Sequence, residues 1–399
     1  MNRNVLISGA SIAGPALAYW LGRHGFQPTV VELAPALRQG GQAVDFRGEA
    51  HLTVLERMGL LPGLRRIQTG GSPMRFVDER GRTLLDLPAE FAGGEIEVLR
   101  GDLARALHEL SLPRTEYVFG DSIVGLTETS DGVRVTFRSG ISRDFGLVIG
   151  ADGLHSNVRR LAFGPEEDYV SHLGYYAATW QLPNELGVGK GSVGYNAPGR
   201  LASVGADHRD PARAGAFFVF AAPRLSYDRH DPEQQQQKRL ISDAFSGLGW
   251  EVPRLLRSLH EAPDLYFDSI SRADVATWST GRVCLVGDAA CGATIGGMGT
   301  GSAIVAAYVL AGELARARGD HRAAFARYES RLRTYAENCQ AGGDRTGKFL
   351  APATATGIRL RNTLLSRRLL LNGMLKLGEK VSSTVTLPDY AADPRHAGR

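Results

Sequence analysis

The sequence predicts an α/β protein in which a parallel sheet flanked by helices carries an inserted, mostly antiparallel sheet. The chain opens with a short apolar strand, a glycine-bearing turn and an apolar helix, which together form a β-turn-α unit. Two later strands, far apart along the chain, each run directly into a glycine and an aspartate. The segment between these two strands is rich in aromatic and β-branched residues, which is typical of antiparallel strands.

Length and composition fit a globular protein of several domains. The 399 residues include 43% hydrophobic and 22% charged side chains, a balance too apolar for a disordered chain. At about 150 residues per domain, this length predicts two or three domains. The three cysteines, Cys284, Cys291 and Cys339, are too few for a disulfide scaffold and suit a reducing cytosol. They show no spacing typical of a zinc site.

Two features of the sequence argue against a membrane or nucleic-acid partner. The N-terminus has no basic segment followed by an apolar one, and the longest apolar stretch, 303–311, is too short to span a bilayer. The net charge is +4, and only five of the 46 basic residues are lysine. The arginines are scattered among acidic residues, whereas a nucleic-acid surface needs a cluster. We therefore expect a soluble, cytoplasmic protein without nucleic acid or a stable membrane partner.

The first turn predicts a dinucleotide site. A strand over 5–8 leads through the turn into a helix over 15–24. In this kind of turn one glycine, here Gly9, permits the tight bend, and another, here Gly14, lets the helix pack on the strand. Ser11 stands at the middle position, and its small side chain can itself donate to phosphate. The predicted phosphate-binding residues are Gly9, Ser11, Ile12, Ala13 and Gly14.

The second strand, 29–31, ends in Glu32, which is placed to accept hydrogen bonds from an adenosine ribose. These features alone do not distinguish a binding site for NAD from one for FAD. The strand 283–286, however, runs into Gly287 and Asp288 before a glycine-rich helix start. A carboxylate there can bind a ribityl hydroxyl, and the helix N-terminus can stabilise negative charge on a reduced flavin. This second site favours FAD, with a simple helix cap as the alternative role of Asp288.

These motifs resemble those of the group A flavin-dependent monooxygenases, which have the para-hydroxybenzoate hydroxylase fold. The turn 9–14 looks like their dinucleotide fingerprint. The segment 150–153, which contains Asp152, is similar to their Asp-Gly motif, thought to contact both FAD and NAD(P)H. Residues 287–290 look like their second FAD motif, and Arg100 matches the family arginine that reaches the flavin cradle.

Within this family, three segments look most like the tetracycline-inactivating flavin monooxygenases, the tetracycline destructases. They are residues 40–48, 265–268 and 386–390. The resemblance implies a Rossmann-like FAD-binding domain with further cofactor-binding residues. These are Arg47, Arg100, Asp152, Gly287, Asp288, Gly299, Thr300 and Gly301.

The order of the motifs implies a discontinuous FAD-binding domain, made of residues 1–72, 96–165 and 276–345. The substrate-binding domain would take residues 73–95 and 166–275. A C-terminal helical segment, 346–399, would bridge the two domains. Its basic residues would suit a membrane surface, whereas its leucines favour packing between the domains. We expect the bridging role.

The loop 291–299 departs from the family pattern, because it lacks the usual proline and is slightly shorter. In the family this loop lies beside the isoalloxazine ring. We expect FAD binding to survive, while the oxygen chemistry and the substrate position are open to change. Cys291 could be a flavin anchor or a nucleophile, but no adjacent basic residue lowers its pKa, so a small loop residue is the favoured interpretation.

The resemblance implies an FAD-dependent monooxygenase that acts, as a monomer or homodimer, on a small aromatic, polycyclic substrate of the polyketide or tetracycline kind. NAD(P)H would reduce FAD as a transient partner, O₂ would give a flavin C4a-hydroperoxide, and one oxygen atom would pass to the substrate. The role could lie in antibiotic biosynthesis or resistance. Two alternatives stay open: a natural-product-binding protein that retains FAD without catalysis, and a flavin oxidoreductase of the same fold with altered oxygen chemistry. No side chain is predicted to be catalytic, because the flavin carries the chemistry.

The substrate is expected between the flavin and the aromatic-rich strands. Phe218 and Phe220 alternate with Val219 and therefore share one face of a strand. An aromatic stripe of this kind belongs to a hydrophobic core more often than to a ligand pocket. Which face of the strand contacts the ligand is left open. The candidate substrate residues are Trp180, Tyr195, Phe218 and Phe220.

Overall fold

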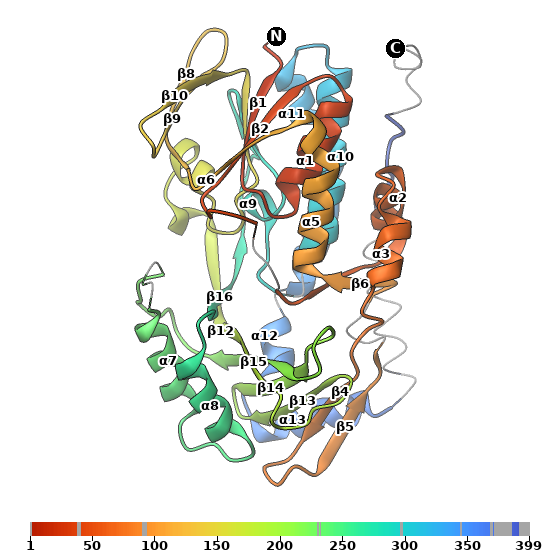
Figure 1. Ribbon diagram of the computed structural model, residues 1–399, viewed down its shortest axis with the longest axis vertical. Helices are drawn as coiled ribbons and strands as arrows, with labels where there is room; N and C mark the ends of the chain where they lie inside the picture. Colours follow the sequence, from red (N-terminus) through yellow and green to blue (C-terminus); the bar gives the residue numbers. More distant parts are fainter. Residues whose placement is uncertain are drawn as a thin grey trace.

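The computed structural model describes residues 2–37, 41–89, 94–229, 231, 233–295, 298–343, 345–367, 370 and 385–390. Two large sheets lie one above the other along the long axis of the molecule (Figure 1). The upper sheet is six-stranded and the lower sheet is seven-stranded, and helices accompany both. The predicted α/β fold class is confirmed.

The six-stranded sheet has the order β17-β18-β11-β1-β2-β7 and is parallel except for the short edge strand β17. Its central strands are buried along most of their length, as Leu6 and Val148 are, because other elements cover both faces of a parallel sheet. The strands are β1 (Asn4–Ser8), β2 (Gln27–Glu32), β7 (Glu116–Phe119), β11 (Leu147–Gly150), β17 (Ser279–Thr280) and β18 (Val283–Leu285).

Three helices of this half, α1 (Ala13–Arg23), α5 (Arg100–Ser111) and α10 (Gly299–Arg316), begin at or near the carboxyl ends of its strands. Helix α1 follows β1 and packs against α10 and α5. Helix α11 (His321–Gly343) packs on α10. Both α1 and α10 are apolar on most of their surface, because they lie between the sheet and other helices.

The seven-stranded sheet has the order β16-β12-β15-β14-β13-β4-β5, with antiparallel neighbours except for the parallel pair β13 and β4. Helices α7 (Gln235–Phe245) and α8 (Val252–Glu261) pack on one face, and α12 (Thr346–Leu350) and α13 (Ala355–Leu365) pack on the other. The strands are β4 (Met74–Val77), β5 (Thr83–Leu87), β12 (Val170–Pro183), β13 (Ser192–Ala197), β14 (Arg200–Ala206), β15 (Arg213–Ala221) and β16 (Tyr266–Ala273).

Smaller elements complete the described fold. A three-stranded antiparallel sheet has the order β10-β9-β8, and a two-stranded ribbon joins β3 and β6. These strands are β3 (Ala43–Phe46), β6 (Ile96–Leu99), β8 (Ile123–Glu128), β9 (Val133–Phe137) and β10 (Ser142–Phe145). The short helices are α2 (Gly48–Arg57), α3 (Leu61–Ile67), α6 (Asn157–Ala162), α9 (Asp288–Cys291), η1 (Leu112–Arg114) and η2 (Glu166–Asp168).

The C-terminal part of the chain contacts both halves of the molecule. Arg361 of α13 donates to Asn196 Oδ1 of β13, at 2.7 Å. The segment 385–390 instead packs on α10, where the buried Tyr390 donates to Glu313 Oε1 at 2.8 Å. The remainder of the predicted bridging helix, 371–384, lies outside the described residues. Among the described helices none combines the length and apolar character that a membrane span requires.

Candidate cofactor site

The turn after β1 has the close packing that its glycines predict. Gly9 has a φ of +105°, and a Cβ placed on it would lie 2.6 Å from the carbonyl oxygen of Ala151. A Cβ on Gly14 would lie 1.9 Å from the carbonyl oxygen of Gly9, so α1 and the turn are in direct backbone contact. Neither the N-cap residue, Ile12, nor any acidic residue covers the first turn of α1 with a side chain. The N-terminus of α1 can therefore receive an anion.

Two predicted site residues flank this turn. Glu32, at the end of β2, accepts hydrogen bonds from the backbone N–H groups of Ala10 and Ala34, at 2.8 and 2.9 Å. Arg100, the first residue of α5, donates through Nη2 to Ser11 Oγ at 3.0 Å. A carboxylate and a guanidinium thus both bind the turn that precedes α1.

Asp152 connects the Asp-Gly motif, residues 150–153, to the strand that precedes the first turn, residues 9–14. Its Oδ2 accepts from Ser8 Oγ and from Val158 N–H, both at 3.1 Å, and its Oδ1 accepts from Ser156 Oγ at 2.5 Å. Burial raises the pKa of this carboxyl, and the three hydrogen bonds work against that shift. Asp152 therefore ties the end of β1 to the start of α6.

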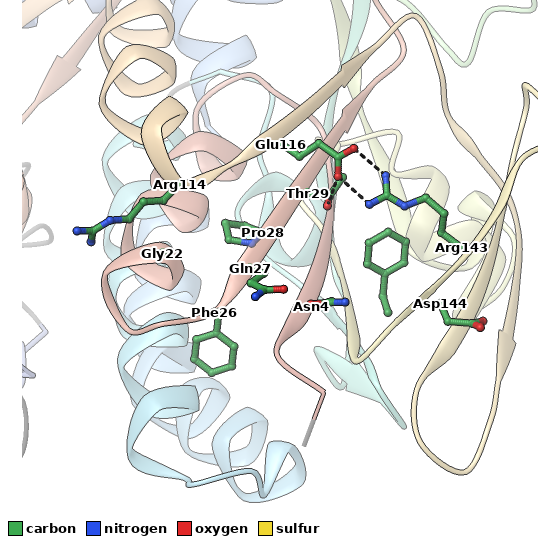
Figure 2. Close-up of a pocket in the computed structure, with 11 residues that line it drawn as sticks. Asn4, Gly22, Phe26, Gln27, Pro28, Thr29, Arg114, Glu116, Arg143 and Asp144 are labelled. Carbon is green, nitrogen blue, oxygen red and sulfur yellow. Dashed lines mark hydrogen bonds and ion pairs between the residues drawn. The ribbon is translucent and has the colours of Figure 1, made fainter.

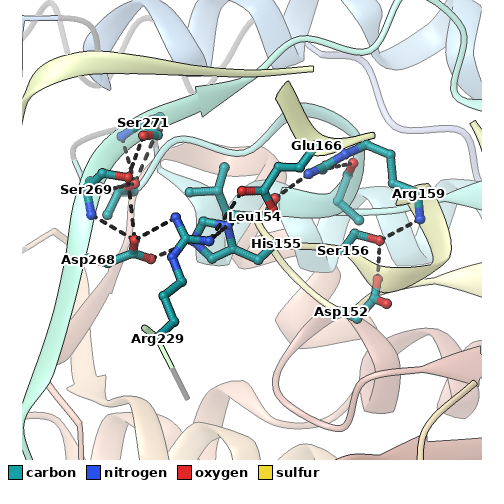
Figure 3. Close-up of polar contacts among 12 residues, drawn as sticks. Asp152, Leu154, His155, Ser156, Arg159, Glu166, Arg229, Asp268, Ser269 and Ser271 are labelled. Atoms are coloured by element: carbon teal, nitrogen blue, oxygen red, sulfur yellow. Dashed lines mark hydrogen bonds and ion pairs between the residues drawn. The ribbon is translucent and has the colours of Figure 1, made fainter. Parts of the chain in front are cut away.

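Arg159, on α6, connects the Asp-Gly motif, residues 150–153, to the motif at residues 287–290. Its fully buried guanidinium donates to the carbonyl oxygens of Leu154, at 2.5 Å, and Ala289, at 2.9 Å (Figure 3). Burial lowers the pKa of Arg159. The sequence does not indicate this contact, because Ala289 is far away from Arg159 along the chain.

Asp288 is the third predicted anchor. Gly287 brings it in between α1 and α10, since a Cβ there would lie 3.2 Å from Ala13 Cβ and 3.3 Å from Ala303 Cβ. A Cβ on Gly299, the first residue of α10, would lie 3.0 Å from Asp288 Oδ1. Burial raises the pKa of Asp288, and the charge of Arg100 opposes this shift.

The Asp288 side chain forms no hydrogen bond or ion pair with any residue that the structure describes. Asp288 is partly exposed, so its carboxylate is open to a ligand, and its placement beside a helix N-terminus fits a ligand that brings hydroxyl groups. The residues present thus fit the adenosine, phosphate and ribityl parts of FAD.

His51 belongs to this region and carries no motif by which the sequence could indicate it. Its buried Nδ1 accepts from the backbone N–H of Arg47 at 3.3 Å, so its Nε2 carries the proton and donates to Tyr335 Oη at 2.6 Å. A Cβ on Gly301 would lie 2.2 Å from the imidazole, so the ring fills the space beside the first turn of α10. Desolvation lowers the pKa of His51 to about 4. The Arg47 side chain itself is paired with Asp45.

The predicted substrate residues lie elsewhere. Trp180, Phe218 and Phe220 are at most 3% exposed and pack beneath α7 and α8. The Trp180 indole donates to Ser258 Oγ of α8 at 3.0 Å, and the Phe218 ring lies 4.4 Å from that of Phe245, between centroids. Tyr195 is partly buried on the same face. Two helices therefore cover the face that these residues share, and the assignment of these residues to the substrate stays a prediction.

The opposite face of the sheet is the one near the cofactor motifs. In the register of β16 against β12, Tyr266 and Asp268 oppose Thr179 and Ala177 and so point away from Trp180. The pKa of Tyr266 is raised by desolvation and by the Asp268 carboxylate, whereas nearby Arg100 opposes the shift. The electrostatic influence of Arg100 reaches from the first motif to this strand.

Cys291, the last residue of α9, is not activated for reaction. Burial raises the pKa of its thiol far above the neutral range, and the Asp288 carboxylate adds to this effect. Residues 296 and 297 of the predicted flavin loop lie outside the described residues.

A separate hollow of about 630 Å³ lies at the other end of the parallel sheet (Figure 2). Asn4 and Gln27, at the amino ends of β1 and β2, line it together with the ion pair of Arg143 and Glu116. Ligands of open α/β sheets bind at the carboxyl ends of the strands. The predicted cofactor residues, which follow those ends, are therefore remote from this hollow.

Known proteins are similar to this chain in both sequence and fold. A family described as an FAD binding domain matches residues 2–180. A flavin-dependent monooxygenase of Legionella longbeachae is 35% identical over 394 residues, 98% of each chain. An uncharacterised protein of Mycobacterium tuberculosis is 44% identical over 348 residues, 85% of this chain and 92% of its own. The crystal structure of tetracycline destructase Tet(51) has a TM-score of 0.86 and 32% identity, and it covers 98% of this chain and 100% of its own.

These similarities run through all three motifs and through both sheets. The resemblance to the tetracycline-inactivating branch is confirmed, and FAD is the cofactor. The chain belongs to the family of flavin-dependent monooxygenases.

Proposed function

We propose that the protein uses NAD(P)H and O₂ to insert one oxygen atom into a small aromatic, polycyclic molecule of the tetracycline or polyketide type. The main observation behind the cofactor site is the carboxylate of Asp288, which lies beside the first residue of α10, is partly exposed and forms no hydrogen bond or ion pair with the residues that the structure describes. The substrate class rests on the similarity to tetracycline destructase Tet(51) over nearly the whole chain.

We assign the FAD contacts as follows. The N-terminus of α1 and Arg100 bind the phosphates, and Glu32 binds the adenosine ribose. Asp288 accepts from the ribityl hydroxyls, and the first turn of α10, Gly299 to Gly301, stabilises negative charge at the flavin. Bound FAD supplies the redox chemistry with O₂. The chain's own part is to hold this group and to exclude water.

We also propose that the halves of the molecule correspond to the two predicted domains, with the substrate between β16 and the loop that follows α9. This placement agrees with the face on which Tyr266 and Asp268 lie. The few cysteines suit the cytoplasm as the place of action.

The assignment of Asp288 predicts a specific loss of FAD. D288A should weaken FAD binding by roughly tenfold to a hundredfold, because it removes hydrogen bonds to a charged acceptor. FAD affinity is measured by flavin absorbance after reconstitution and dialysis. D131A is the matched control, since Asp131 is exposed and forms no hydrogen bond among the described residues. Equal flavin occupancy in D288A and D131A would contradict the assignment.

The reaction is tested by NADPH consumption against a panel of tetracyclines and other aromatic polyketides, with mass spectrometry of the products. Substrate-stimulated consumption and a mass gain of one oxygen atom are the expected results. Consumption without any oxygenated product would refute the proposed activity, and a wild-type protein that takes up no FAD would refute the cofactor site.

A further inference from the structure

One strand of the lower sheet, β16, is bonded to both loops that carry predicted cofactor residues. The first loop follows Asp152, and the second follows α9. Asp268 of β16 binds the first loop, and Ser269 and Ser271 bind the second (Figure 3). Neither bond belongs to a motif that the sequence indicates.

The bond to the first loop is made by His155. Its Nε2 lies 2.8 Å from Asp268 Oδ2, and its Nδ1 lies 2.9 Å from Glu166 Oε2. Arg229 Nη1 approaches the same Nδ1 at 2.7 Å and also donates to Glu166 Oε1 at 3.3 Å. Nδ1 therefore has two alternative partners with opposite requirements: a protonated Nδ1 donates to Glu166, and a neutral one accepts from Arg229.

The groups that face His155 explain its protonation. They are Glu166 of η2, Asp268 of β16 and Arg229, with Tyr227 beside Arg229. Desolvation lowers the pKa of His155, but the hydrogen bonds to Asp268 and Glu166 outweigh it and raise the pKa above the ordinary value. The pKa of Glu166 is about 2, because His155 and Arg229 outweigh the effect of its burial.

The bond to the second loop is made by Thr294. Its Oγ1 accepts from Ser271 N–H at 3.0 Å, and its hydroxyl proton is within reach of the Ser269 carbonyl oxygen, also at 3.0 Å. The backbone of the loop adds two bonds, from Thr294 N–H to Ser271 O and from Ala273 N–H to Gly292 O, at 3.1 and 2.9 Å. The loop thus forms an isolated antiparallel bridge with β16, in which Ala293 lies opposite Arg272.

We propose that His155 and Thr294 are positioning residues. They hold the loop after Asp152 and the loop after α9 against β16, and therefore against the seven-stranded sheet. The inference rests on the proposed function, because it takes the two loops to flank the flavin and the sheet to carry the substrate. Neither residue has to touch a ligand for this role. Both act through the position of the backbone that follows a predicted cofactor residue.

Thr294 is tested with T294V, which keeps the shape and loses the hydroxyl, and T294S, which keeps the hydroxyl. T83V serves as the control, since Thr83 is exposed at the edge strand β5. Amide hydrogen exchange of residues 291–295 should rise about tenfold in T294V and stay near the wild-type rate in T294S and T83V. Equal exchange in T294V and T294S would overturn the role of the hydroxyl.

His155 is tested by the pH dependence of the same measurement over residues 153–156 and 266–271. After correction for intrinsic rates, wild-type exchange should rise as the pH increases through the pKa of His155. The imidazolium then loses its charge, so its charge-assisted bonds to Glu166 and Asp268 are reduced to a neutral hydrogen bond to Asp268, which holds the loop on β16 less tightly. In H155Q the corrected rates should not change over this range, and in H155L they should be high throughout. A wild-type profile without this rise, or the same rise in H155Q, would overturn the role of His155.

Protein with and without FAD is measured in parallel, together with visible circular dichroism of the bound flavin. The exchange data test the positioning residues even if the wild type takes up no FAD, which would refute the proposed function alone. If FAD is bound, its dichroism should change in T294V and be restored in T294S. Unchanged dichroism in T294V would show that the loop does not reach the flavin and would overturn the inference.

Discussion

Single polar side chains determine how the three motifs contact one another. Asp152 ties β1 to α6, Arg159 ties that segment to α9, and His51 fills the space beside the first turn of α10. Local pattern predicted Asp152 and Asp288, because each follows a strand and a glycine. Arg159 and His51 have partners that only the tertiary structure brings near, so their roles could not be predicted from spacing.

His51 predicts a pH dependence of stability in the acid range. Its pKa is about 4 in the folded protein, against an ordinary value near 6.5, so the unfolded chain binds more protons between these values. The free energy of unfolding should therefore fall by roughly 3 kcal/mol as the pH decreases from about 6.5 to 4. Urea unfolding at a series of pH values measures this slope.

H51Q is the matched variant, because its amide can still donate to Tyr335 but does not titrate. Its slope over this pH range should be smaller than that of the wild type by the His51 contribution. Identical slopes in the two proteins would show that His51 titrates normally.

Among the helices and strands, sequence patterns predicted where strands and turns occur better than which face of a sheet is covered by helices. The strand–glycine–aspartate units depend on neighbouring residues, and they lie where the spacing predicts them. The alternation of Phe218 and Phe220 placed both on one face correctly. Which face is covered depends on α7 and α8, whose packing is a long-range property that the strand itself does not encode.

The coverage by α7 and α8 predicts that Phe218 contributes to stability and not to binding. F218A should lower the free energy of unfolding by about 3–5 kcal/mol, the usual effect of deleting a buried ring. FAD affinity should stay within twofold of wild type. The control is L84A, since Leu84 is 53% exposed and its truncation should have a small effect. An F218A protein with wild-type stability but altered binding of a substrate would show that the face under α7 and α8 contacts the substrate.

In the whole molecule, the C-terminal part of the chain ties the two halves together. Residues 355–365 pack on the lower sheet, and residues 385–390 pack on α10. The Tyr390 ring lies against Gly312 so closely that a Cβ there would be 2.2 Å from its Cδ2 atom. Pro388 O accepts from Arg57 Nη1 at 3.0 Å and Tyr308 Oη at 2.8 Å.

Gly312 therefore predicts a test of this attachment. G312A should displace the Tyr390 ring and lower the melting temperature, although alanine ordinarily favours a helix over glycine by about 1 kcal/mol. G63A is the control, because its Cβ would meet only Arg66, at 3.8 Å, and should have a neutral or stabilising effect. Thermal unfolding followed by circular dichroism distinguishes the two. A melting temperature of G312A at or above that of wild type would show that Tyr390 does not hold the segment in place.

The strand order of the upper sheet also has a consequence for biosynthesis. β11 pairs with β1 on one side and with β18 on the other, yet all of β12 to β16 is synthesised between β11 and β18. On the ribosome the lower sheet can therefore complete its strands while one edge of β11 still lacks its partner. An unpaired, apolar strand edge is prone to association with other chains. We therefore expect this edge to stay open on the nascent chain until β18 has been synthesised, and we expect flavin to bind only after the first turn of α10 has followed.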